Sequence, residues 1–211
     1  RTWHAEGILR PAGRLLMRSM PRRAMQPGDR NVSPLHDTRS LARRWLRGDR
    51  TNGPATLAAL RAAAPDLLLL GGCGIVRRPL LEIPAIGSIN AHPGLLPEFR
   101  GVSVVAWSLH LGCIPGATVH WVDEGVDTGD LILRRSLPSL PGPMLADVER
   151  AVGTLAVALM IEAVEQVADG TAPRMPQTAS EGRRYSLMPK AIRREVVRDL
   201  RRGAVPREAV A

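Results

Sequence analysis

The stretch Asp66-Leu-Leu-Leu-Leu-Gly-Gly-Cys-Gly74 indicates the fold class more clearly than any other part of the chain. Its short apolar run ends on glycines, as buried strands of parallel sheets commonly do. A helix is predicted just before it, over residues 54–63, because Pro54 suits a first helical turn and Leu57 and Leu60 share one face. A helix followed by such a strand is typical of an α/β fold.

The same alternation continues on both sides of this stretch. Further strands are predicted within 83–89, running on to Asn90, and over 117–122 and 131–135, with helices over 102–111, 144–168 and 190–202. We therefore expect an open, mostly parallel, Rossmann-like sheet with flanking helices. Residues 11–24 are predicted to be helical, and no apolar strand is recognised before residue 28, so the first strand of the sheet is expected to be missing.

Composition divides the chain into three segments. Residues 1–53 are predicted as an Arg-rich segment of helix and loop, 54–170 as the folded core that holds the candidate site described below, and 171–211 as a turn-rich linker followed by a basic helix. Of 211 residues, 45% are hydrophobic, which is enough for a core. No run approaches the ~20 apolar residues of a membrane span, so no membrane partner is expected.

The numbers of charged residues, aromatic residues and cysteines argue against several classes of function. A net charge of +9 favours anionic small molecules, whereas 3% aromatic residues argue against base-stacking platforms for single-stranded nucleic acid. The two cysteines have no C-x-x-C spacing, so neither a disulfide framework nor a zinc ribbon is expected. We predict no metal and a reducing, cytoplasmic location.

The stretch Ser88-Ile-Asn-Ala-His-Pro-Gly-Leu-Leu-Pro-Glu-Phe-Arg-Gly101 carries candidate chemistry. Asn90 and His92 are two residues apart, so an extended chain puts both side chains on one side. They come at the carboxyl end of a predicted strand, where open α/β sheets bind their ligands. Taken alone, the pair is weak evidence, because a histidine near a strand end is more often structural and an asparagine there is more often a turn former.

A second segment, Val122-Asp-Glu-Gly-Val-Asp-Thr-Gly-Asp130, is too acidic and glycine-rich for a strand and lies between two predicted strands. It is either a simple hairpin connector or a loop that delivers a carboxylate to His92. Spacing alone does not choose among its aspartates.

Together the two segments resemble the folate-dependent formyltransferases. That family carries Asn-x-His-Pro-Ser-Leu-Leu-Pro and, further along, Asp-x-Gly. The corresponding residues are Asn90, His92, Pro93, Leu95, Leu96, Pro97 and Asp127-Thr128-Gly129. The resemblance runs from about Pro54 to Pro138. It departs from the family at Gly94, where a serine is usual, and in the missing first strand.

The resemblance implies transfer of a formyl group from 10-formyltetrahydrofolate to a primary amine of a small-molecule acceptor, such as an amino sugar or a nucleotide-linked sugar. Asn90 and His92 would donate to the formyl oxygen, where charge grows. Asp127 would accept a proton from the amine, directly or through water. The implied folate pocket consists of Gly72, Cys73, Gly74, Ile75, Val76 and Asp123.

Two further residues are candidates for the acceptor side, each with a structural alternative. Arg100 would either meet an acceptor phosphate or cap its loop. His120 would either line the acceptor site or be a buried structural histidine.

Other functions remain open at this level. Only about 40 residues follow the long predicted helix, so a tRNA acceptor is disfavoured. The alternatives to transfer are hydrolysis of formyltetrahydrofolate and non-catalytic binding of folate or a nucleotide by a degenerate fold. Supply of the missing strand by a second chain would make the protein a homo-oligomer.

Overall fold

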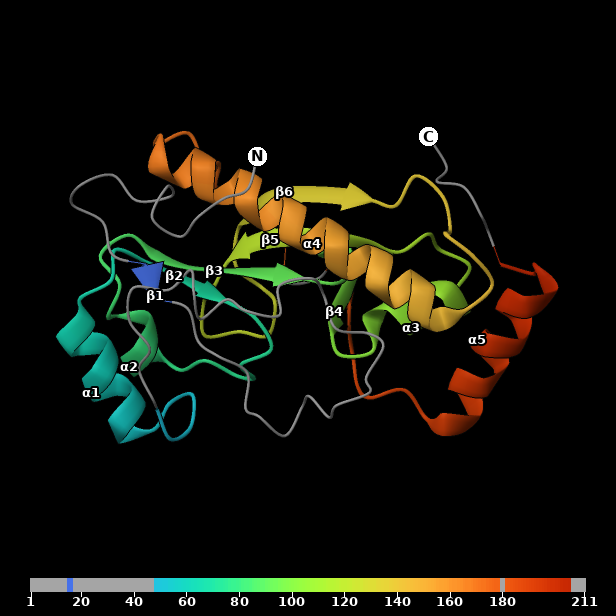
Figure 1. Ribbon diagram of the computed structural model, residues 1–211, viewed down its shortest axis with the longest axis horizontal. Coiled ribbons are helices and arrows are strands. Elements are labelled where there is room, and N and C mark those ends of the chain that lie inside the picture. The colour runs from blue at the N-terminus through green and yellow to red at the C-terminus, as the bar shows by residue number, and fades with distance from the viewer. Residues whose placement is uncertain (1–14, 17–47, 179–180, 206–211) are drawn as a thin grey trace, which may run out of the picture. The chain divides into compact units, whose positions relative to one another are not determined.

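The computed structural model describes residues 15–16, 48–178 and 181–205 (Figure 1). Its contacts divide the chain into two compact units, one up to Ile89 and the other from Asn90 onward. Strand β3 (Gly87–His92) spans that division. The fold is mixed α/β with a central sheet and flanking helices, as predicted. The three predicted segments, 1–53, 54–170 and 171–211, stay a prediction.

The first unit contains β1 (Leu15–Leu16), α1 (Pro54–Ala63), β2 (Leu67–Leu70) and α2 (Arg78–Leu81). β1 runs parallel to β2, and β2 lies between β1 and β3. Helix α1 has the predicted bounds, with proline in its first turn and Ala64 in a left-handed conformation at its end. The buried cluster of this unit is built from Leu60, Leu68, Val76 and Leu80.

Strand β1 corrects two expectations about the N-terminus. Leu15–Leu16 form a strand where a helix over 11–24 was predicted, and a strand is therefore present before β2. The local sequence pattern suggested a helix, but strand formation depends on a pairing partner, which a local pattern does not reveal. The rest of the predicted 11–24 helix lies outside the described residues.

The second unit contains β4 (Phe99–Gly101), α3 (Val104–His110), β5 (Gly116–Trp121), β6 (Leu131–Ser136), α4 (Leu145–Ala168), β7 (Arg183–Tyr185) and α5 (Lys190–Arg202). β5 lies between β3 and β6 and is antiparallel to β6. All six residues of β5 are buried, because α4 packs across β5 and β6 (Figure 1). The predicted positions of β5, β6, α3, α4 and α5 are confirmed to within two residues at each end.

Three short elements were not predicted from the sequence: α2, β4 and β7. β4 and β7 form a separate parallel pair that aligns Gly101 with Tyr185, so the turn-rich linker contains a strand. Each has three residues and pairs with a segment some 80 residues away, which local periodicity does not report. Gly101 is required there, since its φ is +96° and a Cβ would collide with the Tyr185 carbonyl. β3 also begins later than expected, at Gly87.

Two helices show amphipathic packing within this unit. α5 buries Val196 and Leu200, and Arg193 pairs with Glu149 of α4 at 2.9 Å. α4 is long and apolar enough to cross a membrane by length and composition. One such helix is weak evidence, because a core helix meets the same criterion, and α4 uses its buried residues to cover β5.

Candidate active site

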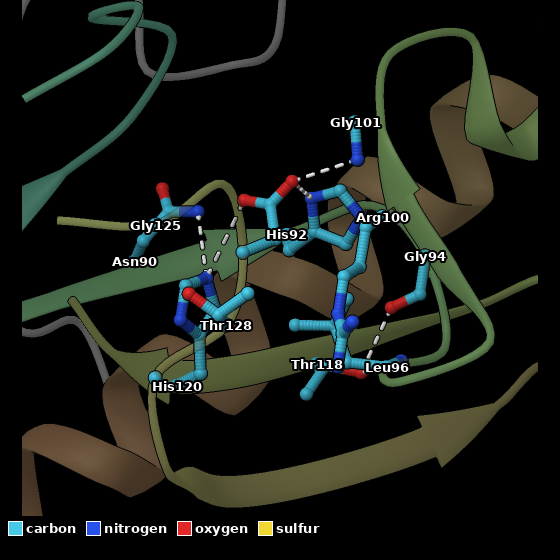
Figure 2. A network of polar contacts seen from close by, with 12 residues as sticks. Asn90, His92, Gly94, Leu96, Arg100, Gly101, Thr118, His120, Gly125 and Thr128 are labelled. Carbon is cyan, nitrogen blue, oxygen red and sulfur yellow. Dashed lines mark hydrogen bonds and ion pairs between the residues drawn. The ribbon is translucent and has the colours of Figure 1, made fainter. Parts of the chain in front are cut away.

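The second unit brings four of the predicted polar residues together: Asn90 and His92 from β3, His120 from β5, and Asp127 from the loop after β5 (Figure 2). Asn90 and His92 stand on one side of the extended strand, as their two-residue spacing predicts. Pro93, which follows His92, ends the strand. The second, acidic segment is thus more than a hairpin connector, because it carries a carboxylate to both histidines.

The two ring nitrogens of His92 have different partners. Nε2 is 2.7 Å from the Phe99 carbonyl oxygen, and a carbonyl only accepts, so Nε2 carries a proton and donates it. Nδ1 lies 3.6 Å from Oδ2 of Asp127, which is ion-pair range but too long for a good hydrogen bond. Only Nδ1 is therefore available to a substrate, and it donates only when the ring is doubly protonated.

Asp127 is held in place at both its main chain and its side chain. Its φ of +55° is uncommon for a residue with a Cβ. The Gly101 amide donates to its Oδ2 at 2.8 Å, and Gln177 donates to its main-chain carbonyl at 3.2 Å. The carboxylate thereby faces His92 and lies 3.7 Å from Nε2 of His120 through its Oδ1.

His120 orients the amide of Asn90. Burial lowers the pKa of His120, an effect that the Trp121 carbonyl and Asp127 partly oppose. The ring is therefore neutral near pH 7. Its Nδ1 donates to the Trp121 carbonyl at 2.7 Å, so Nε2 holds a lone pair and accepts from the Asn90 amide nitrogen at 3.2 Å. This fixes which end of the amide is the donor and matches the structural alternative considered for this histidine.

The two remaining polar candidates in this unit have structural partners. Arg100 is buried, and its Nη2 donates to Gln177 at 3.2 Å and to the Thr178 carbonyl at 3.3 Å. These are the contacts of a loop-stabilising arginine, and a phosphate contact stays a prediction. Asp123 accepts from the Gly125 amide at 3.0 Å and the Thr128 hydroxyl at 2.7 Å, which closes the acidic loop; its role in folate binding also stays a prediction.

The predicted folate segment 72–76 belongs to the first unit, where it follows β2. Two of its main-chain carbonyls are held by side chains: Thr51 donates to that of Cys73, and Asn52 to that of Ile75 at 2.8 Å. Gly74 adopts a φ of +71°, and a Cβ there would meet nothing within 4 Å. Ile75 is 61% exposed. The segment thus has an open glycine backbone beside an exposed apolar side chain, which suits a flat ring.

Two residues of the second unit that sequence reasoning missed support the site. The buried Thr118 hydroxyl accepts from the Leu96 amide at 3.0 Å and donates to the Gly94 carbonyl at 2.8 Å, which holds the loop after β3 (Figure 2). Its place on β5, two residues before His120, was the available signal. Gln177 lies in the linker and gave no local signal. In the part of the chain described here, no group of three or more His, Cys, Asp or Glu is arranged to hold a metal.

Comparison with known proteins identifies the class. A model of the formyl transferase family matches residues 16–164, so the chain belongs to this family. It is 36% identical over 129 residues to a methionyl-tRNA formyltransferase from Syntrophus aciditrophicus, covering 60% of this chain and 41% of that protein. It is 36% identical over 140 residues to a cytosolic 10-formyltetrahydrofolate dehydrogenase from Xenopus tropicalis, covering 65% of this chain and 15% of that protein.

Solved structures agree on the fold. Glycinamide ribonucleotide transformylase 1 from Symbiobacterium toebii is 33% identical, with a TM-score of 0.51 over 64% of this chain and 62% of that one. The formyltransferase PseJ from Anoxybacillus kamchatkensis is 21% identical, with a TM-score of 0.56 over 68% and 72%. The chain spans less than half the length of the two curated relatives named above.

Proposed function

We propose that this protein transfers a formyl group from 10-formyltetrahydrofolate to a primary amine of a small-molecule acceptor. The observation that carries the proposal is the convergence of Asn90, His92 and Asp127, with Nε2 of His92 committed to Phe99 and Nδ1 facing the carboxylate. This arrangement combines two donors with one base, as acyl transfer to an amine requires.

The donor is supported by the family and by the folate segment. The chain is similar to 10-formyltetrahydrofolate dehydrogenases, whose name carries the same folate. Gly74, where a Cβ would meet nothing within 4 Å, and the exposed Ile75 suit a pteridine ring. Gly72, Cys73, Val76 and Asp123 are assigned to the folate by the family resemblance alone, and the Val76 side chain is buried in the core of the first unit. When bound, the folate supplies a formyl group on one of its nitrogens.

The chain's own residues then act on the two ends of the reaction. The Asn90 amide, oriented by His120, and Nδ1–H of His92 donate to the formyl oxygen, where negative charge grows as the amine nitrogen bonds to the formyl carbon. One such donor is worth about 2.7–4 kcal/mol in comparable enzymes. Asp127, whose Oδ2 lies 3.6 Å from Nδ1 of His92, favours a proton on that nitrogen and accepts the amine proton. The bond from the formyl carbon to the folate nitrogen breaks, and that nitrogen takes up a proton.

The acceptor divides the relatives. The name of glycinamide ribonucleotide transformylase, which is 33% identical, refers to a small amine as acceptor. The name of methionyl-tRNA formyltransferase, which is 36% identical, refers to a tRNA. We favour a small amine, such as an amino sugar or a nucleotide-linked sugar. We also propose a reducing, cytoplasmic setting, because the sequence has two cysteines without the spacing of a disulfide framework.

The test is an acceptor panel with purified protein and 10-formyltetrahydrofolate. Release of tetrahydrofolate is followed by absorbance, and N-formyl products by mass spectrometry, for amino sugars, nucleotide-linked amino sugars, glycinamide ribonucleotide and methionyl-tRNA. Release that depends on a small amine, and is lost in Asp127→Asn, supports the proposal. Formylation of methionyl-tRNA alone replaces the acceptor. Equal release without any amine indicates hydrolysis, and binding of 5-formyltetrahydrofolate without release indicates a folate-binding protein.

A further inference from the structure

We propose that Gln177 is a positioning residue for the Asp127 carboxylate, a role that rests on the proposed formyl transfer for its effect on rate. Gln177 lies in the linker after α4, 50 residues along the chain from Asp127. Its Nε2 is 3.2 Å from the carbonyl oxygen of Asp127 and 2.6 Å from that of Gly129. Its Oε1 is 3.2 Å from Nη2 of Arg100.

The chemistry of these partners fixes the orientation of the Gln177 amide. Main-chain carbonyls only accept hydrogen bonds, so the nitrogen must face Asp127 and Gly129. A guanidinium only donates, so the oxygen must face Arg100. All three contacts agree on one orientation, and they tie the two ends of the Asp-x-Gly turn to a buried arginine of β4.

The turn needs such a restraint. Asp127 has a φ of +55°, which costs a residue with a Cβ about 1–2 kcal/mol relative to ordinary backbone. Between Asp127 and Gly129 the chain reverses before β6, whose first residue, Leu131, bonds to the linker at Met175 in both directions, at 2.8 and 3.1 Å. Gln177 follows Met175 by two residues, so this bridge brings it to the turn, where it bonds to main-chain carbonyls and not to the carboxylate itself.

The conformation of the turn sets the position of the Asp127 carboxylate, because Asp127 is itself a residue of the turn. Asp127 Oδ2 accepts from the Gly101 amide at 2.8 Å and lies 3.6 Å from His92. If the turn relaxes toward negative φ, the side chain swings away from both groups. Arg100, which donates to the Gln177 side chain, directly precedes Gly101 in β4, so two adjacent residues of this strand are bonded to the two groups that hold the turn, the Gln177 amide and the Asp127 carboxylate.

Gln177→Glu is the informative variant. It keeps the size of the side chain and an acceptor for Arg100, but it replaces the nitrogen by an oxygen that faces two carbonyls. Glu181→Gln is the matched control, because Glu181 lies in the same linker and its carboxylate accepts from the Thr178 amide at 3.2 Å without touching the turn. If docking of the linker alone matters, the two variants behave alike.

Two measurements separate the positioning role from the proposed reaction. In the first, Gln177→Glu lowers kcat for the best acceptor by about 10- to 100-fold, the loss typical of a misplaced catalytic group, with KM for donor and acceptor within about threefold of the parent. Glu181→Gln leaves kcat within about twofold. An equal loss of kcat in both variants overturns the proposal, as does an unchanged kcat in Gln177→Glu.

The second measurement needs no activity. The exchange rate of the Gly101 amide hydrogen, followed by NMR in the full chain, reports whether Asp127 still accepts its bond. We expect exchange to be at least about tenfold faster in Gln177→Glu and unchanged in Glu181→Gln, with the thermal midpoints of both variants compared as a check on folding. If the parent protein transfers no formyl group, the proposed function is wrong, but the comparison of Gly101 exchange rates still tests whether Gln177 positions Asp127. Unchanged Gly101 exchange in folded Gln177→Glu contradicts the positioning role.

Discussion

Gly94 leaves room for the hydrogen bond that orients His92, and adding a single methyl group there should disturb it. A Cβ at Gly94 would stand 2.8 Å from Nε2 of His92, 2.9 Å from the Phe99 carbonyl oxygen and 3.0 Å from Cγ2 of Val104. The first two atoms are the donor and acceptor of the 2.7 Å bond that commits Nε2. Gly94→Ala therefore introduces a carbon against both partners at once.

The size of the effect follows from these distances. Non-bonded carbon contacts are favourable at about 3.5–4.0 Å, so these three atoms must move away by at least about 0.5–0.7 Å. Overpacking of a buried site costs about 1–3 kcal/mol. For a chain of this length, that lowers Tm by about 2–12 °C. A displacement of His92 on this scale should also lower kcat, by about tenfold if a 1 Å error costs a hundredfold.

The assay compares Gly94→Ala with Gly153→Ala in thermal unfolding and in amine-dependent release of tetrahydrofolate. Gly153 lies on the exposed face of α4, and a Cβ there meets nothing within 4 Å, so its replacement should raise stability by about 0.5–1 kcal/mol and leave kcat unchanged. Gly94→Ser introduces the residue usual in the family motif; because serine also has a Cβ, the same packing argument predicts that it too lowers Tm and kcat. If Gly94→Ala keeps the parental Tm and kcat, the packing argument at His92 is refuted.

Three further outcomes are expected. Asp127→Asn keeps an acceptor for the Gly101 amide but loses the charge and the base, so kcat should fall by about 10²–10⁴-fold with little change in Tm; a normal kcat would remove Asp127 from the mechanism. Thr118→Val removes two buried hydrogen bonds to the loop after β3 and should cost about 1–3 kcal/mol, measured by urea unfolding; a change within error would contradict it. Burial lowers the pKa of His120 in the folded chain. As the pH falls below about 6.5, the unfolded chain therefore binds a proton at this histidine before the folded chain does. The free energy of unfolding should then decrease with falling pH until the pH reaches the pKa of His120 in the folded chain. Tm measured between about pH 7.5 and 5 should depend less on pH in His120→Asn, and equal slopes would count against a buried neutral ring.

The sequence alone was sufficient for the long elements and for the family. Helix α1 begins at a proline, and α4 ends just before Gly170. The ends of these helices are thus marked by local residues that start or stop a helix. The motif around Asn90 and His92 and the turn at Asp127 were recognisable because both belong to the sequence pattern of the family.

The short elements were not recognisable in this way. β1, β4 and β7 have two or three residues each, and each exists because a distant segment offers main-chain partners. The local sequence predicted a helix at Leu15–Leu16 and an irregular linker around Arg183–Tyr185. Both stretches are strands because of the segments with which they pair, and their own residues do not show this.

The sequence by itself determined which side chains are available: an asparagine and a histidine two residues apart at the end of a strand, and an aspartate in a glycine-rich turn. Only the tertiary structure decided how each is used. It assigned Nε2 of His92 to Phe99, oriented the Asn90 amide through a neutral His120, and placed Gln177 against the Asp127 turn. The physical reason is that hydrogen-bond donors and acceptors are fixed by partners from other strands and loops, and those partners are close in space but far apart along the chain.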